Sequence, residues 1–442
     1  MRYREYPAYK ESGVEWLGAV PEGWEVLPLK YTCSYNDETL SGKTPPDYQI
    51  EYVDISSVDK TSGISKTETL SYKKSPSRAR RIVRDGDIII STVRTYLEAI
   101  ARIQKPPGNL IVSTGFAVVR PQRNFYANFA FYAVRCRYFI ESIVAYSVGI
   151  SYPAINASEL VRLHVVAPPY SEQTAIAKFL DRETPKIDNL IAKQQELIEL
   201  LQEKRQAAIS HAVTKGLNPE VKMKDSGVDW LGEVPEHWKV GKLRFFANIQ
   251  GGIAKGRKYN NQKTISVPYL RVANVQDGFL DLTNVYNIEI LPSELKRYLL
   301  QDGDVLMNEG GDNDKLGRGA VWKSELTPCI HQNHVFAVRP KGIESLWLST
   351  VTQASYAKFY FFSVAKQSTN LASISSTNIK RLQIVVPPTA EREKILKYIE
   401  LQCKKIDVLI AKASAAILLI QERRTALISA AVTGKIDVRN PD

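Results

Sequence analysis

The sequence contains no apolar run long enough to cross a bilayer. Its richest apolar stretch covers only residues 415–420, whereas a transmembrane helix needs about 20 residues. The charged first residues are not followed by an apolar segment, so we expect no secretory signal. No lipidation motif is found either. These absences argue against membrane-spanning and secreted proteins.

Cysteine is scarce for a chain of 442 residues. The four cysteines, Cys33, Cys136, Cys329 and Cys403, are scattered and form no Cys-x-x-Cys pair. This spacing argues against a disulfide framework and favours a reducing compartment. We therefore expect a cytoplasmic protein that does not bind a membrane.

Acidic residues are outnumbered by basic ones. The chain has 59 Lys and Arg against 47 Asp and Glu, which gives a formal net charge of +12. Such a surface suits nucleic acid or an anionic membrane. The apolar stripes of the helices expected below are too broad for membrane-surface anchors. Nucleic acid is the expected partner.

The chain contains two copies of one pattern. Residues 10–24 and 224–238 share a Trp-Leu-Gly-x-Val-Pro-x-x-Trp opening, with Trp16 and Trp230 lying 214 residues apart. Residues 187–193 return at 406–412, an offset of 219. Fixed-period similarity of this kind indicates an internal duplication.

Between these matched ends the two copies diverge. They share only a skeleton: Asp85-Gly-Asp87 matches Asp302-Gly-Asp304, Arg120-Pro matches Arg339-Pro, and Pro168-Pro matches Pro387-Pro. Even drift after duplication would have eroded frame and interior alike. We therefore favour one scaffold used twice, with two different recognition surfaces. Short Val- and Ile-rich runs separated by Gly, Pro and Asn predict strands and loops in these interiors.

Each copy ends in a predicted helix. In the first copy Thr184 is the expected N-cap and Pro185 the first helical residue, and Gly216 with Pro219 gives the stop. Apolar residues recur at spacings of three and four, and each stays apolar 219 residues later, which is typical of a coiled-coil seam. The main seam positions are Ile187, Ile191, Ile198, Leu201, Ile406, Ile410, Ile417 and Ile420. The two helices are expected to pair antiparallel; packing of each helix on its own domain is the alternative.

These residues resemble the specificity subunit of Type I restriction-modification enzymes. Besides the tryptophan-rich openings, the resemblance is carried by the 41–45 loop (Ser-Gly-Lys-Thr-Pro), residues 268–274, residues 303–308 and the helix tail 421–434. The likeness extends over essentially the whole chain. No single motif is diagnostic, but the set is specific.

The resemblance implies an α+β protein: two mixed α/β target recognition domains in a pseudo-two-fold arrangement, joined by two long antiparallel coiled-coil helices. The boundaries would be residues 1–168 and 217–386 for the two domains, and 169–216 and 387–442 for the helical spacers. The family reads a bipartite, gapped target in double-stranded DNA.

The resemblance also implies a chain that is not an enzyme and holds no cofactor of its own. Two methyltransferase subunits would supply S-adenosylmethionine chemistry. Two restriction subunits with ATP and magnesium are a further partner that the resemblance leaves open. Two alternatives also stay open: a self-contained DNA methyltransferase or nuclease, and a coiled-coil protein-binding scaffold.

Candidate DNA contacts are basic, amide and aromatic residues on predicted loops. The densest basic stretch, residues 73–84, has six basic and no acidic residues; a solvated loop is the alternative explanation for it. The first-copy candidates are Lys43, Lys73, Lys74, Arg78, Arg80, Arg81, Arg94, Tyr96 and Tyr152. The second-copy candidates are Lys255, Arg257, Lys258, Asn308, Asn313, Lys315, Arg318, Ser375 and Asn378.

Three motifs resemble catalytic or metal sites but lack required residues. Ala167-Pro-Pro-Tyr170 has Ala where an amino-methyltransferase needs Asn or Asp. Residues 251–258 are close to a P-loop, but Arg257-Lys258 stands where Lys and Ser or Thr are needed. Cys329, His331 and His334 lack a fourth ligand and have no counterpart in the first copy. We therefore expect no catalytic, cofactor or metal site.

Overall fold

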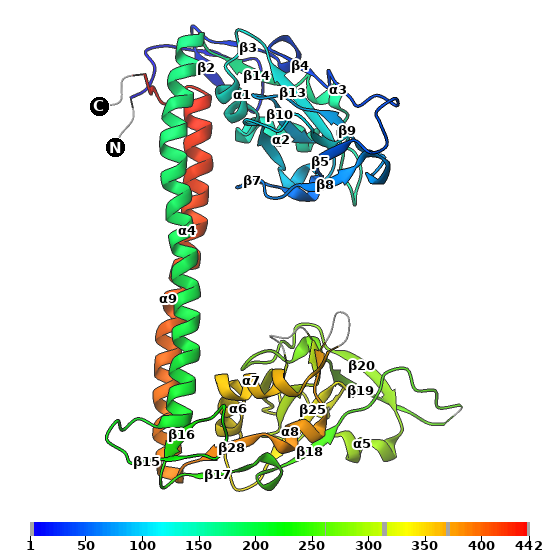
Figure 1. Cartoon of the computed structure of the whole chain (residues 1–442), viewed down its shortest axis with the longest axis vertical. Coiled ribbons are helices and arrows are strands. Elements are labelled where there is room, and N and C mark those ends of the chain that lie inside the picture. The colour runs from blue at the N-terminus through cyan, green and yellow to red at the C-terminus, as the bar shows by residue number, and fades with distance from the viewer. Residues whose placement is uncertain (1–3, 261, 312–315, 368–371, 440–442) are drawn as a thin grey trace. The chain divides into compact units, whose positions relative to one another are not determined.

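A computed structural model describes residues 4–260, 262–311, 316–367 and 372–439. The chain divides into two compact units (Figure 1). Unit 1 comprises Met1–Gln194 and Ala415–Asp442, and unit 2 comprises Gln195–Ser414. The unit boundaries fall inside the two long helices, so each unit holds one globular domain and part of each helix.

Unit 1 is built on two four-stranded sheets with the orders β11-β10-β13-β4 and β8-β5-β12-β9. The first sheet and its helices bury Ile88, Val119, Phe129 and Phe139 in the larger core. The strands are β1 (Tyr9–Glu11), β2 (Ala19–Pro21), β3 (Glu25–Pro28), β4 (Cys33–Tyr35), β5 (Gln49–Val53), β6 (Val58–Asp59), β7 (Gly63–Ile64), β8 (Glu68–Ser71), β9 (Ala79–Ile82), β10 (Ile88–Ser91), β11 (Ile100–Arg102), β12 (Leu110–Ser113), β13 (Phe116–Pro121) and β14 (His164–Ala167). The short helices are α1 (Ala127–Val134), α2 (Arg137–Ala145) and α3 (Ala157–Leu160).

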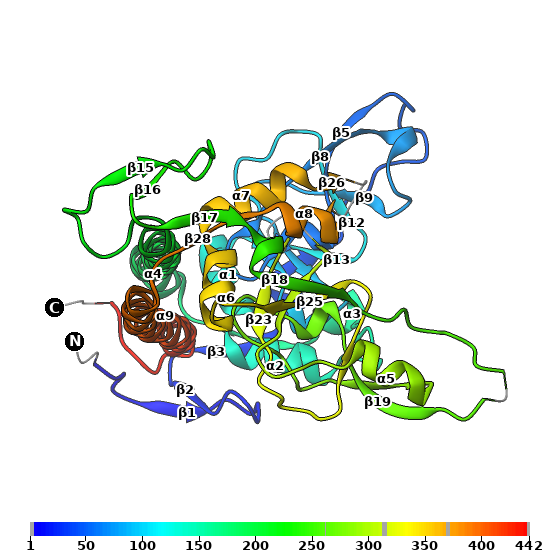
Figure 2. The same ribbon diagram turned by 90° about the horizontal axis from the view of Figure 1, so that it is seen from below.

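Unit 2 has sheets with the orders β23-β21-β25-β18 and β20-β19-β24. Figure 2 shows β17 beside β28, the strand that leads into the second long helix. The strands are β15 (Met223–Asp225), β16 (Glu233–Pro235), β17 (Lys239–Lys242), β18 (Ala247–Gly251), β19 (Ile265–Leu270), β20 (Tyr286–Ile290), β21 (Val305–Asn308), β22 (Gly310–Gly311), β23 (Gly319–Val321), β24 (Ile330–His331), β25 (Val335–Pro340), β26 (Lys366–Gln367), β27 (Ala372–Ser373) and β28 (Gln383–Val386). The short helices are α5 (Pro292–Tyr298), α6 (Ser345–Gln353), α7 (Ser355–Val364) and α8 (Ser376–Arg381).

The two domains share one topology. The order β11-β10-β13-β4 corresponds strand by strand to β23-β21-β25-β18. In both second sheets a parallel pair, β5 with β12 and β19 with β24, carries an antiparallel neighbour on the same strand. The duplicated frame therefore specifies one mixed α/β fold twice, although the interior sequences differ.

A buried ion pair explains the skeleton that the two copies share. Asp87 is fully buried, and its two carboxylate oxygens accept hydrogen bonds from Nε and Nη2 of Arg120, both at 2.8 Å. In unit 2 Arg339 binds the buried Asp304 in the same way, at 2.7 and 2.8 Å. The Asp-Gly-Asp and Arg-Pro motifs are therefore the two halves of one structural contact.

Replacing Asp304 with Ala is expected to lower the free energy of unfolding of unit 2 by about 2–3 kcal/mol. The substitution leaves Arg339, whose side chain is only 33% exposed, without its carboxylate. Urea unfolding measures the change. Arg162→Ala is the matched control, because its ion pair with Glu159 is exposed on both sides and is worth less than about 1 kcal/mol. Equal losses in the two variants would contradict the assignment.

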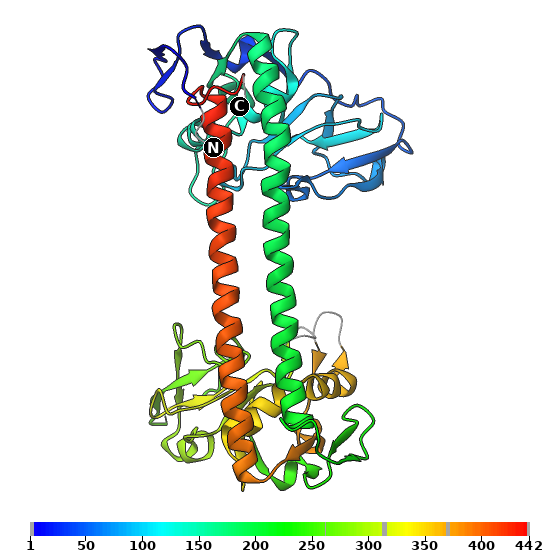
Figure 3. The same ribbon diagram turned by 90° about the vertical axis from the view of Figure 1, so that its left-hand side faces the viewer.

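The two long helices are α4 (Tyr170–Lys215) and α9 (Thr389–Val432), and they pack together (Figure 3). Each helix follows directly on a strand and a Pro-Pro pair. In unit 1 the buried Gln173 side chain donates to Pro168 O at 2.8 Å, and in unit 2 Arg392 donates to Pro387 O at 2.8 Å. The Pro-Pro motif is thus the junction between strand and helix in both units.

The predicted start of the first long helix was wrong. Helix α4 begins at Tyr170, and Pro185 lies inside it. Thr184 is not an N-cap, because its hydroxyl donates to Leu180 O at 2.7 Å as a residue within the helix does. Burial of Ile176, Ala177 and Leu180 in the core of unit 1 holds the helix together across the proline. The predicted stop is correct: Gly216, at φ +78°, takes the left-handed conformation typical of a residue that ends a helix.

Repeat-equivalent ion pairs join α4 to α9. In unit 1 Arg424 Nε lies 2.7 Å from Asp188 Oδ1, and in unit 2 Arg205 Nε lies 3.4 Å from Asp407 Oδ1. Residue numbers rise along α4 as they fall along α9, so the helices are antiparallel. Asp407 and Arg424 each lie 219 residues after Asp188 and Arg205, so the same contact occurs once in each unit with the two helices exchanging roles.

The predicted seam positions are buried or half-buried in these helices. Ile187, Ile198, Leu201 and Ile406 are buried, with at most 9% of each side chain exposed. Four further positions are half-buried: Ile191, Ile410, Ile417 and Ile420. Among the described residues, no helix combines the length and the apolar character that a membrane span requires.

Each long helix is also tied to the tryptophan-rich opening of its own unit. Trp24 Nε1 donates to Glu172 Oε2 at 3.0 Å near the start of α4, and Trp238 Nε1 donates to Glu391 Oε2 at 3.1 Å near the start of α9. Both indole rings are buried, with 1% exposed. The opening motif is therefore a clamp that seats a helix on a domain.

Candidate nucleic-acid interface

The basic loops predicted in the first copy come together along one edge of the unit 1 domain. Tyr72 Oη donates to Ser41 O at 3.3 Å, and Lys73 N donates to Pro46 O at 2.9 Å, so the Lys43 loop packs on the 72–75 turn. Arg80 stacks its guanidinium over the Tyr72 ring, 4.6 Å from the centroid. Lys43, Lys73 and Lys74 all remain exposed beside this packing.

The sheet extends this edge to Arg94 and Tyr152. Thr114 N donates to Arg78 O at 2.8 Å, and Thr92 N donates to Gly115 O at 2.9 Å. Arg94, two residues after Thr92, stacks on the Tyr152 ring at 4.8 Å. We call Lys43, Lys73, Lys74, Arg78, Arg80, Arg94 and Tyr152 the first basic edge.

Strand direction explains why these residues meet. β9 runs antiparallel to β12, so the start of β9 at Ala79 lies opposite the end of β12 at Ser113. β10 runs antiparallel to β13, so its end at Ser91 lies opposite Phe116. The β12–β13 turn links the two sheets at this point. Loops that lie far apart in sequence therefore share one edge.

Two arginines of this edge are partly engaged by the protein itself. Arg78 Nη2 lies 2.9 Å from Asp54 Oδ2, and contact with the Tyr52 hydroxyl and with Asp54 raises the pKa of the guanidinium. Arg81 is half-buried, and its Nε atom lacks a hydrogen-bond partner. Tyr96 is 55% exposed in the turn that follows Arg94.

Unit 2 carries a basic edge of different composition. Lys255, Arg257 and Lys258 are exposed on the loop after β18. The Tyr286 ring, at the start of β20, lies 5.7 Å from Lys255 Nζ and 3.9 Å from the Arg271 guanidinium carbon. We call Lys255, Arg257, Lys258, Arg271 and Tyr286 the second basic edge.

Sequence reasoning missed Arg271 and Tyr286. Arg271 follows β19 directly, and its counterpart in the first copy is the acidic Asp54, so comparison of the copies pointed away from it. The available signal was its place in a loop at the end of an apolar strand. Arg257, by contrast, was named from sequence and is ion-paired with Glu294 at 2.8 Å.

Some second-copy candidates have structural roles. Asn308 is 2% exposed, and its amide donates to Val275 O at 2.9 Å, so we leave it out of the interface as a correction. Ser375 and Asn378 bond to each other at the start of α8, with Asn378 N donating to Ser375 Oγ at 3.2 Å, so their pattern is a helix cap. Arg318 is half-buried beside Gln276. Asn313 and Lys315 lie outside the described residues.

The residues that resembled a metal site or a nucleophile are separated or buried. The His331 ring is buried with Nδ1 2.7 Å from Val335 O, whereas His334 is exposed and lies 2.6 Å from Glu309. Burial raises the pKa of Cys33 to about 12 and that of Cys329 to about 12, so both stay protonated near neutral pH.

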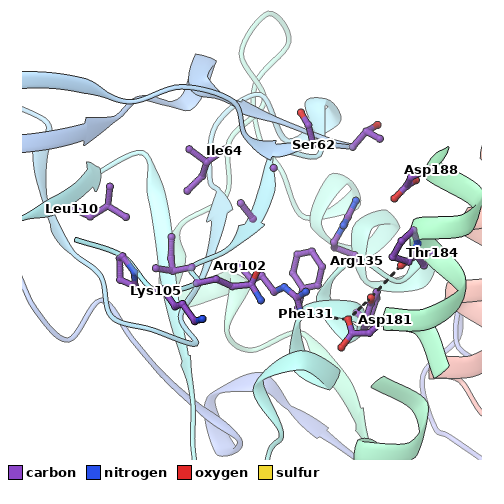
Figure 4. Close-up of a pocket in the computed structure, with 18 of the residues that line it drawn as sticks. Ser62, Ile64, Arg102, Lys105, Leu110, Phe131, Arg135, Asp181, Thr184 and Asp188 are labelled. Atoms are coloured by element: carbon purple, nitrogen blue, oxygen red, sulfur yellow. Dashed lines mark hydrogen bonds and ion pairs between the residues drawn. The ribbon is translucent and has the colours of Figure 1, made fainter. Parts of the chain in front are cut away.

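A cavity of about 560 Å³ in unit 1 lies apart from the first basic edge (Figure 4). Its wall at the long helices holds Asp181, which accepts a hydrogen bond from Tyr132 at 2.8 Å. Burial and the nearby Arg424 lower the pKa of Arg135 to about 10. None of the predicted DNA contacts lines this cavity.

The long helices leave several large apolar side chains exposed. Leu190 is 50% exposed in unit 1 and its repeat equivalent Leu409 is 49% exposed in unit 2. Leu200 in unit 2 is 55% exposed and its equivalent Leu419 in unit 1 is 66% exposed. Each unit thus presents one exposed leucine of this set from each helix. We call these four residues the exposed leucine set.

Comparison with known proteins gives a consistent result over the chain. The family described as "Type I restriction modification DNA specificity domain" matches residues 21–200 and 235–412. The specificity subunit of the Type I restriction enzyme EcoKI from Escherichia coli (strain K12) is 21% identical over 450 residues, which cover 96% of this chain and 92% of that protein. The specificity subunit of the MjaVIII enzyme from Methanocaldococcus jannaschii is 25% identical, with 98% of each chain covered.

A solved structure supports the fold. A chain from work on "complex assembly" and "conformational transition of the type I R-M system" superposes with a TM-score of 0.71 at 22% identity. The superposition covers 94% of this chain and 99% of that one. At this level of identity the likeness supports the shared fold and nothing finer.

Proposed function

From the premise that this chain belongs to the Type I restriction-modification DNA specificity family, we propose that it reads a bipartite, gapped target in double-stranded DNA and directs two methyltransferase subunits to it. Membership makes the chain the non-catalytic specificity subunit of a multisubunit enzyme. The self-contained methyltransferase or nuclease and the protein-binding scaffold are therefore set aside.

One observation carries the proposal: the same fold occurs twice with a different basic edge on each copy. The edges follow equivalent sheets, yet Asp54 in the first copy corresponds to Arg271 in the second. Cations along an edge bind phosphates, and the side chains among them discriminate bases. Two unlike edges on one chain are suited to two unlike half-sites.

The paired helices supply the second part of the proposal. Because α4 and α9 each belong to both units, we infer that they set the length of the unread spacer between the half-sites. Changing the length of both helices together would then change the spacer, at about 1.5 Å per residue along the helix axis.

The exposed leucine set is our candidate docking surface for the methyltransferase subunits. Leu190 with Leu419 in unit 1 is repeat-equivalent to Leu409 with Leu200 in unit 2. Two equivalent apolar positions suit two copies of one partner. S-adenosylmethionine would be held by those partners, and ATP with magnesium by restriction subunits where these join.

The proposal is tested by finding the target and then measuring binding to it. Methylome sequencing of cells that express the chain with its methyltransferase should reveal one split motif. The purified complex should then bind a duplex carrying this motif with an affinity that falls about 10³-fold or more between 50 and 200 mM salt, if six or more phosphates are contacted.

Two control duplexes sharpen the test. A duplex with one scrambled half-site should bind far more weakly than the full target, and a duplex with the spacer lengthened by one base pair should bind as weakly as a scrambled one. Equal binding of all three duplexes, or a continuous methylated motif, would overturn the bipartite assignment.

A further inference from the structure

An apolar tip projects from the first basic edge. Ile150 is 103% exposed and Val148 is 80% exposed, so their side chains are in full contact with solvent. Tyr152 is 63% exposed on the same loop, and Tyr96 is 55% exposed on the neighbouring turn. We call Tyr96, Val148, Ile150 and Tyr152 the apolar tip. Exposed apolar side chains gathered in this way mark a binding surface.

The loop that carries the tip is firmly held. Val148 N donates to Ala154 O at 2.8 Å and Ala154 N donates to Val148 O at 3.0 Å, which closes the loop at its base. Ile155 N donates to Thr92 O at 2.9 Å, and the hydroxyls of Thr95 and Ser147 are 2.8 Å apart. Ile150 is therefore exposed on an anchored loop.

The neighbouring turn stores backbone strain. Arg94 at φ +50° and Glu98 at φ +51° both adopt the left-handed conformation on either side of the Thr95–Leu97 turn. A non-glycine residue in this region costs about 1 kcal/mol or more and tends to be kept where it positions a functional side chain. Here the strain presents the Arg94 guanidinium against Tyr152.

The charges around the tip favour DNA as its occupant. Among the described residues Arg94 forms no ion pair with a carboxylate, so its charge is available for a phosphate. The nearest carboxylate, that of Glu98, is held by Lys60 at 2.7 Å. The tip therefore combines free positive charge with apolar side chains. Apolar contact in the major groove recognises the 5-methyl group of thymine.

We propose that Ile150 reads the 5-methyl group of a thymine in the half-site bound by unit 1, while Arg94, stacked on Tyr152, holds the adjoining phosphate. This inference rests on the proposed function and names a base feature that the first domain recognises. The second copy has Thr369 at the equivalent position, outside the described residues, so the contact would belong to the first half-site alone.

The test replaces each thymine of the first half-site singly by deoxyuridine, which removes only the methyl group. The complex of the full chain with its methyltransferase is titrated with each duplex at fixed salt. One substitution should weaken binding about fourfold, the effect of losing one buried methyl group. Ile150→Ala should weaken binding of the natural target at least as much, and should abolish the effect of the deoxyuridine.

Controls separate this inference from the proposed function. Leu346→Ala, at a position 57% exposed in unit 2, should leave every affinity unchanged. If the wild-type complex binds no split target, the proposed function fails. If it binds but no deoxyuridine matters, if the half-site has no thymine, or if Ile150→Ala binds normally, the inference alone fails. Increased fluorescence of 2-aminopurine that depends on Ile150, without a methyl effect, would mean insertion between bases and would also overturn it.

Discussion

Alanine at the five exposed cations of the first basic edge is expected to lower affinity for the full target about a thousandfold near physiological salt. Each lost phosphate contact removes about 0.9 from the slope of log affinity against log salt, so five losses reduce the slope by about four to five. The five residues are Lys43, Lys73, Lys74, Arg78 and Arg94. Titrations from 50 to 200 mM salt measure both quantities.

The same variant should lose one half-site and keep the other. Scrambling the second half-site should still weaken its binding, whereas scrambling the first should have little further effect. A charge-matched control replaces five exposed lysines of the long helices, Lys193, Lys204, Lys404, Lys405 and Lys412. If this control loses as much affinity as the edge variant, the effect is one of net charge and the interface assignment is wrong.

Glutamate at Leu190 and Leu419 is expected to remove one methyltransferase subunit from the complex. Burying two carboxylates in an apolar contact costs several kcal/mol unless they are paired, which corresponds to a loss of affinity of about 10³-fold or more. Native mass spectrometry should show the stoichiometry of methyltransferase to this chain fall from two to one. The repeat-equivalent pair, Leu200 and Leu409, should give the same result in unit 2.

All four substitutions together should leave no methyltransferase bound and methylation near background. Leu346→Glu is the control, because Leu346 is similarly exposed but lies on α6, outside the long helices. Unchanged stoichiometry in the fourfold variant would exclude the exposed leucine set as the docking surface. Circular dichroism of the free chain checks that the helices remain folded.

Local sequence rules worked where local interactions decide the structure. Gly216 ends its helix because a left-handed residue without a Cβ suits that position. The same rules failed at Thr184 and Pro185, which together imitate the start of a helix. There the buried face formed by Ile176, Ala177 and Leu180 extends the helix toward its N-terminus, and this tertiary packing outweighs the proline.

Candidate contacts chosen by residue type were separated only by burial. Asn308 and Lys255 both occupy predicted loops of the second copy, yet Asn308 is buried and bonded to backbone whereas Lys255 is exposed beside Tyr286. Ile150 was not chosen, because an apolar side chain in a sequence is expected to be buried. Its exposure follows from the way Val148 and Ala154 close the loop beneath it.

The sequence by itself determined the duplication, the fold class, the two long helices and the family, because these depend on periodicity and on motifs that repeat along the chain. The tertiary structure alone decided which basic side chains share an edge, that Arg120 belongs to Asp87 and Arg339 to Asp304, and which leucines stay exposed. The physical reason is that strand pairing brings together residues far apart in the chain. Exposure is then a property of those neighbours rather than of the residue itself.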